Sequence, residues 1–127
     1  MASITQPQIT TFKAGGTIRK YRFVKLDSAG QVVECTASGR AIGVGQNSES
    51  VSSGEFIEVA LSGGGAKLEA AEAIGIGKLI TSTSVGKGEV ADAANEFVGA
   101  IAFEPAAADG DVIGVRVVAF QATQSDA

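Results

Sequence analysis

The sequence predicts an all-β protein: a small β-barrel or β-tulip-like sandwich of two pseudo-repeated halves, with one short helix and an extended N-terminal arm. Three observations favour this class. Glycine accounts for 17 of the 127 residues, about twice its usual share. Ala, Val and Ile dominate an apolar fraction of 45%, whereas aromatic residues make up 6%. Short apolar runs alternate with turn signals at the spacing typical of sandwiches and barrels.

Composition divides the chain into three segments. Residues 1–11 carry β-branched and polar side chains and Pro7. They predict an extended arm, because proline lacks a backbone donor and Thr and Ile favour extended geometry. Residues 12–120 predict one β domain, since the chain has the length of a single domain. Residues 121–127 predict a polar C-terminal tail.

Strand-like runs follow one another along the β domain. The first four are residues 21–27, 31–36, 41–44 and 55–61, and the last four are residues 78–82, 89–93, 97–103 and 112–120. Residues 66–74 lie between the two groups and contain Leu68-Glu69-Ala70-Ala71-Glu72-Ala73. These strong helix formers predict the one short helix. On such a helix Glu69 and Glu72 share one face, which is expected to be solvated.

An internal repeat is suggested by a shift of 56 residues, which relates residues 18–61 to residues 74–117. Glycines mark the register, because Gly30, Gly43 and Gly54 fall on Gly86, Gly99 and Gly110. Shared glycines imply shared turns, since glycine adopts positive φ without steric cost. The remaining identities are Ile18 with Ile74, Ser28 with Ser84, Ala37 with Ala93, Ile57 with Ile113 and Val59 with Val115.

The residues of common catalytic and metal sites are missing. The chain has no histidine and one cysteine, Cys35, which excludes histidine triads, zinc ribbons and iron–sulfur clusters. A lone cysteine inside a strand-like run is expected to be a buried hydrophobe. We therefore expect no enzyme activity, no cofactor and no metal.

Two motifs imitate ligand sites. Gly75-Ile76-Gly77-Lys78 contains a Gly-Lys pair, but Glu72 and Leu79 occupy the positions at which a phosphate loop needs Gly and Ser or Thr. Asp109 and Asp111 flank Gly110, without the ligand spacing of a calcium loop. We interpret the first as a turn and the second as a solvated turn.

Charge and hydropathy bear on the class of partner. The net charge of −4 opposes non-specific nucleic-acid binding. Lys13, Arg19, Lys20, Arg22, Lys25 and Arg40 give the N-terminal half an excess of cations, interpreted mainly as solvated strand charges. No run approaches the ~18 apolar residues of a membrane span, and no secretory leader is recognisable. These features predict a protein of the cytosol that contacts neither nucleic acid nor membrane.

Function is then expected to reside in protein–protein contacts, and the arm is the first candidate. Ile4, Pro7, Ile9 and Phe12 make it apolar for a solvated tail but too short for a core of its own. Extended segments of this kind bind by adding a strand to a sheet edge or by lying in a groove. These four residues are the predicted contact with a partner protein or a neighbouring protomer.

Glycine-rich apolar runs across most of the chain resemble the capsid decoration (cement) proteins of tailed bacteriophages. The resemblance covers residues 10 to 118, including Phe12–Ile18, Arg40–Val44 and Gly54–Val59 in the first half. Phe97–Ala102 and Gly110–Val115 carry it in the second half.

The resemblance implies a homotrimer made in the bacterial host cytoplasm. It is expected to bind the major capsid protein on the outside of the shell and to stabilise the phage head. The resemblance thus makes a capsid subunit, or a neighbouring protomer, the expected partner of Ile4, Pro7, Ile9 and Phe12. Two alternatives stay open: another phage structural module associated with a tail or fibre, and a β module that binds a host surface or carbohydrate.

Overall fold

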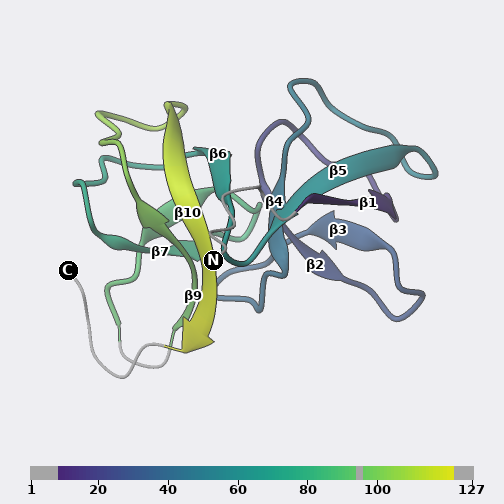
Figure 1. The fold of residues 1–127 in the computed structure, drawn as a ribbon, viewed down its shortest axis with the longest axis horizontal. Coiled ribbons are helices and arrows are strands. Elements are labelled where there is room, and N and C mark those ends of the chain that lie inside the picture. Colours follow the sequence, from purple (N-terminus) through teal and green to yellow (C-terminus); the bar gives the residue numbers. More distant parts are fainter. Residues whose placement is uncertain (1–8, 94–95, 122–127) are drawn as a thin grey trace, which may run out of the picture.

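The computed structural model describes residues 9–93 and 96–121. This part of the chain forms ten strands in two five-stranded antiparallel sheets (Figure 1). The predicted all-β class is confirmed. The limits of the arm, the β domain and the tail remain predictions, because residues 1–8 and 122–127 lie outside the described part.

Residues 9–61 build lobe 1. Its sheet has the order β1-β5-β4-β2-β3, and its strands are β1 (Ile9–Lys13), β2 (Phe23–Leu26), β3 (Val32–Glu34), β4 (Gly43–Gly45) and β5 (Phe56–Leu61).

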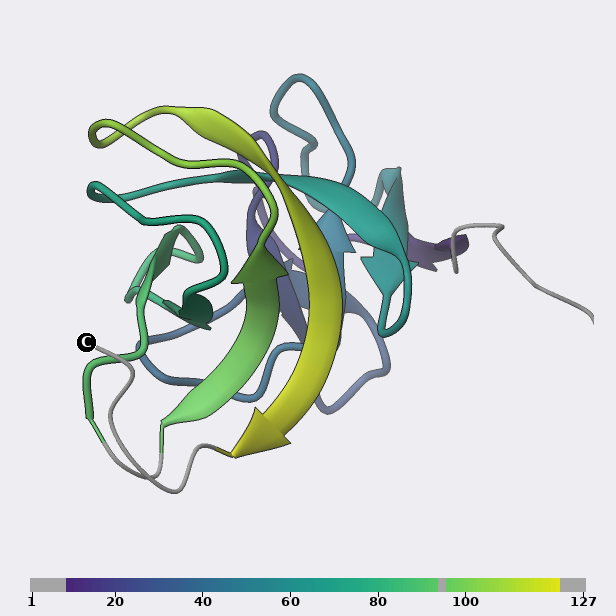
Figure 2. The same cartoon turned by 60° about the vertical axis from the view of Figure 1, so that its left-hand side comes forward.

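Residues 65–121 build lobe 2. Its sheet has the order β6-β10-β9-β7-β8, and its strands are β6 (Gly65–Glu69), β7 (Leu79–Ser82), β8 (Gly88–Val90), β9 (Phe97–Ala102) and β10 (Val112–Gln121). β10 curves along β9, and their register shifts between Val117 and Phe120 (Figure 2).

The two sheets correspond strand for strand at a constant offset. β1 begins at Ile9 and β6 at Gly65, 56 residues later, and the same offset relates β2 to β7, β3 to β8 and the first residues of β5 and β10. Positive φ angles at Gly30 and Gly86 place left-handed turn residues at equivalent points. Residues related by this offset are called counterparts below.

Each sheet curls until its two edge strands meet. A parallel bridge joins Ala14, after β1, to Val32 of β3, and a second joins Ala70, after β6, to Gly88 of β8. The backbone N–H of Gly15 donates to Val32 O at 2.7 Å, and that of Ala71 donates to Gly88 O at 2.8 Å. Pairing part of each edge reduces the open backbone that invites aggregation.

The predicted helix within residues 66–74 is wrong. Residues 65–69 form β6, which pairs with β10 from Val112↔Glu69 to Arg116↔Gly65. Leu68 is fully buried there. Helix propensity amounts to a few tenths of a kcal/mol per residue, so burial and a full strand ladder outweigh it. The described residues contain no helix of membrane-spanning length and hydropathy.

The hydrophobic core runs through both lobes. Lobe 1 has a cluster of its own around Ile18, Val24 and Val59, whereas the largest cluster joins Phe23 and Val44 of lobe 1 to residues of lobe 2. Phe23 packs so closely on β9 that a Cβ at Gly99 would lie 2.5 Å from its Cε1 atom. Glycine at position 99 therefore lets a lobe 1 aromatic ring enter the core of lobe 2.

Candidate functional site

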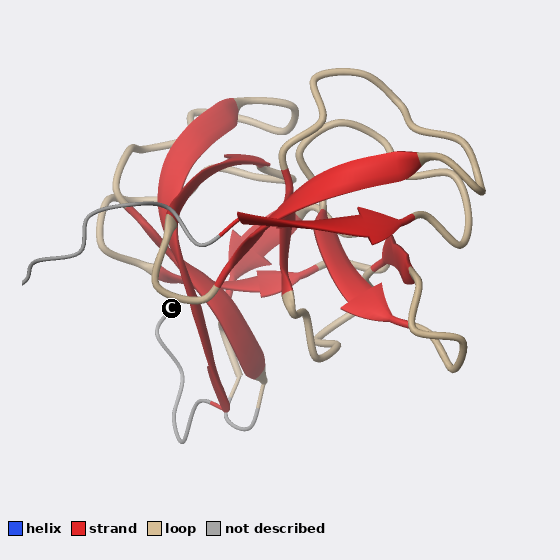
Figure 3. Cartoon of the chain, turned by 45° about the vertical axis from the view of Figure 1, so that its right-hand side comes forward, coloured by secondary structure: helices blue, strands red, loops and turns tan. Residues whose placement is uncertain are grey.

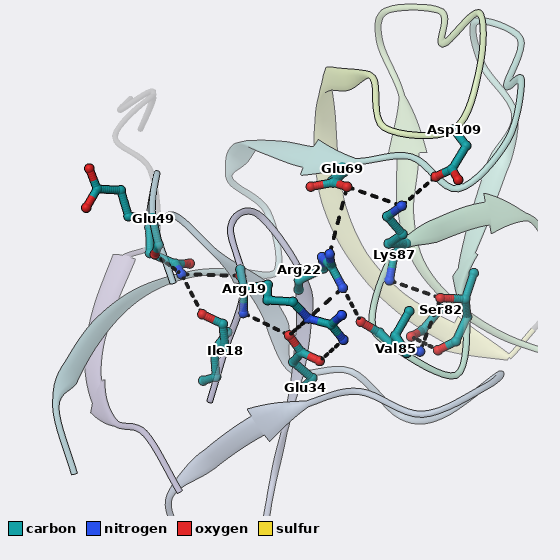
Figure 4. A network of polar contacts seen from close by, with 12 residues as sticks. Ile18, Arg19, Arg22, Glu34, Glu49, Glu69, Ser82, Val85, Lys87 and Asp109 are labelled. Carbon is teal, nitrogen blue, oxygen red and sulfur yellow. Dashed lines mark hydrogen bonds and ion pairs between the residues drawn. The ribbon is translucent and has the colours of Figure 1, made fainter. Parts of the chain in front are cut away.

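A buried ion pair lies at the seam between the lobes. Arg22 directly precedes β2 in lobe 1, and Glu69 ends β6 in lobe 2. Their side chains approach to 3.8 Å between Nη2 and Oε2 (Figure 4). The two residues are 6% and 7% exposed. Buried charges need partners because leaving them unpaired in a low-dielectric interior is costly.

Further charges extend the pair into a chain of alternating sign. On the lobe 1 side, Glu34 lies 3.9 Å from Arg22 and accepts hydrogen bonds from the Arg19 side chain at 2.8 and 3.0 Å. On the lobe 2 side, Lys87 Nζ lies 3.2 Å from Glu69 Oε2 and also bonds to Asp109. Cations and carboxylates thus alternate across the seam (Figure 4).

The pKa of Glu34 reflects its contacts within this row of charges. Burial opposes its ionisation. Hydrogen bonds from the Arg19 side chain and backbone, together with the charges of Arg19 and Arg22, outweigh burial and lower the pKa of Glu34. The carboxylate is therefore ionised at neutral pH and fixed to its cationic partners.

A polar groove of about 310 Å³ opens beside the ion pair. It is lined by Arg19, Lys20, Arg22, Glu49, Ser50 and Glu69. Within the described residues, Arg22 Nε and Glu69 Oε1 have no hydrogen-bond partner. The lining offers donors and acceptors of both charges but holds neither a cysteine nor a histidine. This arrangement suits polar contacts.

Neutral hydrogen bonds close the rest of the seam. The side-chain amide of Gln46 donates to Lys67 O and accepts from Lys67 N, both at 3.1 Å. Phe23 N donates to Gly86 O at 2.7 Å, and Ser38 N donates to Ser82 O at 2.8 Å. Charged, polar and apolar contacts together bind the two lobes into one body.

The predicted arm residues fall in three different settings. Ile4 and Pro7 lie outside the described residues. Ile9 opens β1 opposite Ala60 and is 45% exposed. Phe12 lies in the same strand, half-buried against the lobe 1 cluster. Residues 9–11 of the predicted arm are thus part of a sheet.

β1 is an edge strand with free backbone groups. Thr11 faces Glu58 of β5, and Glu58 O accepts from Gln46 N on the opposite side of β5. Backbone groups of facing residues in an antiparallel ladder point either both inward or both outward. The N–H and C=O of Thr11 therefore point away from β5, where no described residue bonds to them. Figure 3 shows the strand that follows the grey N-terminal trace at the front, uncovered.

The two imitations of ligand sites are turns. Gly77, in the Gly-Lys motif, has φ +84°, and Ile76 before it is 68% exposed. Asp111 Oδ2 accepts from the backbone of Ala107 at 2.7 Å, and Asp109 pairs with Lys87. No group of three or more potential metal-binding side chains occurs in the described part of the chain.

The sequence interpretation missed the seam. Glu69 was expected on a solvated helix face and Arg22 among solvated strand charges, and both expectations are wrong, because each side chain is buried at the lobe contact. The residues next to Arg22 and Glu69 in the sequence do not indicate that either charge is buried, because the partner of each lies in the other half of the chain. Cys35 is 1% exposed at the same seam, and burial, the largest influence, raises the pKa of its thiol.

Most of the described body corresponds to a known protein family. The family model for phage cement proteins matches residues 4–117, which span both lobes and the seam. The chain belongs to the phage cement protein family. A cement protein is a structural protein of the phage capsid, and the predicted function is confirmed at this level.

A solved structure shares the fold of this cement protein. It is the N base of the head fibre gp8.5 of bacteriophage phi29, with a TM-score of 0.66 and 17% sequence identity. The match covers 86% of this chain and 92% of that one. No curated protein sequence matches this cement protein.

Proposed function

We propose that this cement protein decorates the outside of a phage capsid shell by binding the major capsid protein, without catalysing a reaction. Membership of the cement family across residues 4–117 is the observation that carries the proposal. Its bacterial-cytoplasmic synthesis and its assembly as a homotrimer are parts of the same proposal. The fold likeness to a head fibre base supports attachment to a phage head.

The two-lobed body suits such a role mechanically. Buried ion pairs, backbone hydrogen bonds and a shared core join the lobes, so a force applied to one lobe reaches the other. Each copy needs only modest contact energy with the shell, because many copies act together on a symmetric lattice. The groove beside Arg22 and Glu69 offers polar contacts, and a role without catalysis agrees with its side chains.

The arm is the proposed grip on the shell. β1 has a free edge at Thr11, and the segment that carries Ile4 and Pro7 runs directly into it. A free edge lets an extended segment of a capsid subunit add as a further strand. Exposed Ile9 can then contribute apolar contact, whereas Phe12 mainly anchors β1 to lobe 1.

Deleting residues 1–8 tests the grip while leaving β1 intact. We expect the shortened protein to keep the thermal unfolding of the full chain but to lose co-sedimentation with expanded empty capsids. A matched control deletes residues 122–127, which should leave binding unchanged. Full capsid occupancy by the chain that lacks residues 1–8 would disprove a grip through Ile4 and Pro7.

The assay also separates the proposal from the alternative of a tail-associated module. Purified tails are sedimented with the protein beside expanded capsids and unexpanded precursors. Binding to expanded capsids alone supports the decoration role. Binding to tails alone would overturn it.

A further inference from the structure

The polar groove at the lobe seam has walls that are held in a fixed position. One wall is the segment around Ile18, and the other is the loop that contains Glu49 and Val51. Ile18 N donates to Val51 O and Val51 N donates to Ile18 O, both at 2.9 Å. The side-chain amide of Asn47 joins the two walls further, because it donates to Ile18 O at 3.1 Å and to Glu49 O at 2.8 Å. The side chains on these walls therefore line a pre-organised hollow, which lowers the entropic cost of binding.

A strained backbone conformation borders the groove. Tyr21 lies between Lys20 and Arg22, which both line the groove, and its φ of +51° is left-handed. Its counterpart Gly77 adopts φ +84°, which glycine does without steric cost. Tyr21 O accepts a hydrogen bond from Glu69 N at 2.8 Å, so the strained residue contacts the buried ion pair. Strain that glycine would relieve is typical of functional sites.

The polar lining is peculiar to lobe 1. The dipeptide Arg19-Lys20 has the counterpart Gly75-Ile76 in lobe 2. The antiparallel bridge at Ile18, just before the first dipeptide, recurs at Ile74, just before the second. The fold of this segment therefore does not require a polar dipeptide, which points to a role for these side chains outside folding.

The buried ion pair beside the groove has hydrogen-bonding capacity to spare. Arg22 and Glu69 both line the groove and are 6% and 7% exposed. Among the described residues nothing bonds to Arg22 Nε, a donor, or to Glu69 Oε1, an acceptor. Figure 4 shows one carboxylate oxygen of Glu69 turned toward Arg22 and Lys87 and the other on the side away from Lys87. Because unpaired buried polar atoms are costly, the site favours an occupant with both an acceptor and a donor.

The charges around the groove favour an uncharged occupant. Exposed Lys20 and exposed Glu49 have opposite signs, as have the two members of the buried pair. The remaining charge in the lining, that of Arg19, is taken up by two hydrogen bonds to Glu34, at 2.8 and 3.0 Å. An ion of either sign would therefore meet a like charge beside each opposite one, which costs binding energy.

An amide group meets these requirements. It carries an acceptor and a donor on one planar, uncharged group. The carboxamide of Gln46 shows this chemistry at the same seam, because it accepts from Lys67 N and donates to Lys67 O, both at 3.1 Å. The groove volume of 310 Å³ lies at the small end of the range of about 300–1,000 Å³ for ligand pockets. It therefore suits an amide side chain or a short stretch of main chain.

We propose that this groove binds an amide group of the capsid subunit, presented by an Asn or Gln side chain or by the main chain. The amide oxygen faces Arg22 and the amide N–H faces Glu69, while Lys20 and Glu49 border the group at the surface. The choice of the capsid subunit rests on the proposed function, whereas the preference for an amide rests on the groove alone.

Nuclear magnetic resonance of the isotope-labelled full chain tests the preference for an amide without capsids. Acetamide stands for an Asn or Gln side chain and N-methylacetamide for the main chain, and acetate, methylammonium and methanol are the comparison probes. The Arg22 Nε–H signal should shift in a saturable way with an amide and less with each comparison probe. The amide that gives the larger shift identifies side chain or main chain as the source. A larger shift with a comparison probe, or no shift with either amide, would overturn the proposal.

A groove-filling variant of the full chain connects the groove to the capsid. Ser50→Trp fills the groove, and Ser53→Trp is the matched control, because Ser53 is an exposed residue of the same loop outside the lining. Circular dichroism and thermal unfolding verify that both variants are folded. Ser50→Trp should abolish the amide-induced shift and weaken binding to expanded capsids by more than about tenfold. Ser53→Trp should change neither.

The outcomes separate the groove from the decoration role. Capsid binding by Ser50→Trp that equals the wild type would overturn the capsid subunit as the source of the amide. A wild-type chain that does not bind capsids would overturn the proposed function and this partner with it, whereas an amide-induced shift of Arg22 would still support the groove as an amide site.

Discussion

Arg22 and Glu69 meet across the lobe seam although they belong to different halves of the chain. Their side chains are 3.8 Å apart and almost completely buried, and each has a second partner of opposite charge, Glu34 for Arg22 and Lys87 for Glu69. Removing one member of such a chain leaves the others buried without full compensation. The seam is therefore expected to be sensitive to the loss of a single charge.

Replacing Glu69 by alanine should destabilise the fold by about 3 kcal/mol, because Arg22 and Lys87 lose a shared buried carboxylate. Urea unfolding at neutral pH measures the change in the free energy of unfolding. Glu49→Ala is the control, since Glu49 lines the same groove but is exposed, and it should cost less than about 0.5 kcal/mol. Equal effects of the two substitutions would show that the buried pair is not specially important.

The stabilisation from Glu34 should vanish in acid. Its pKa in the folded protein is lowered, chiefly because hydrogen bonds from Arg19 outweigh the opposing effect of burial. A lowered pKa adds stability above the unfolded-state value of about 4.3, and this stability is lost as the pH falls through the lower folded-state pKa.

Comparing the wild type with Glu34→Gln by urea unfolding, from about pH 7 to about pH 3, checks this dependence. The wild type should be the more stable protein at neutral pH, and the difference should shrink towards the acid end. A difference that is constant across this range would contradict the ionic role of Glu34.

Close packing of Phe23 on Gly99 should make the lobe seam intolerant of a single methyl group. A Cβ at position 99 would lie 2.5 Å from the Phe23 ring, so Gly99→Ala should cost about 1–3 kcal/mol through overpacking. Gly16→Ala is the control, because the nearest atom to a Cβ there is 4.0 Å away. Adding Phe23→Leu should recover part of the loss, since the two changes touch one contact.

Alkylation of Cys35 supplies the second readout of the same experiment. Cys35 is buried at the seam, so Gly99→Ala should accelerate its reaction with iodoacetamide under native conditions, whereas Gly16→Ala should not. An unchanged rate despite lost stability would show that the seam does not open locally.

The order and identity of most elements could be predicted from the sequence. Gly30, Gly54 and the apolar runs between them marked turns and strands, because positive φ and period-two burial are local requirements. The helix prediction at residues 66–74 failed for the opposite reason. β6 exists because β10 pairs with it, and that partner lies more than forty positions away in the chain.

The candidate site divides in the same way. A role without the usual catalytic residues followed directly from composition, since residues that are missing from a chain are missing from every site. Ile9 could be singled out as a candidate contact residue from its apolar character, whereas its position in a strand paired with β5 could not be predicted. Arg22 and Glu69 were both assigned to solvent, because burial of a charge depends on partners that only the packed lobes supply.

The sequence by itself determined the all-β class, the glycine turns, the cement-family resemblance and the absence of histidine chemistry, because each of these depends on residue type or local spacing. Only the tertiary structure decided that lobe 1 packs on one face of lobe 2 and leaves its own equivalent face open. The physical reason is that burial of Ser82 and exposure of its counterpart Leu26 arise from long-range packing. Nothing in the neighbouring sequence of either residue encodes which of two similar faces another lobe will cover.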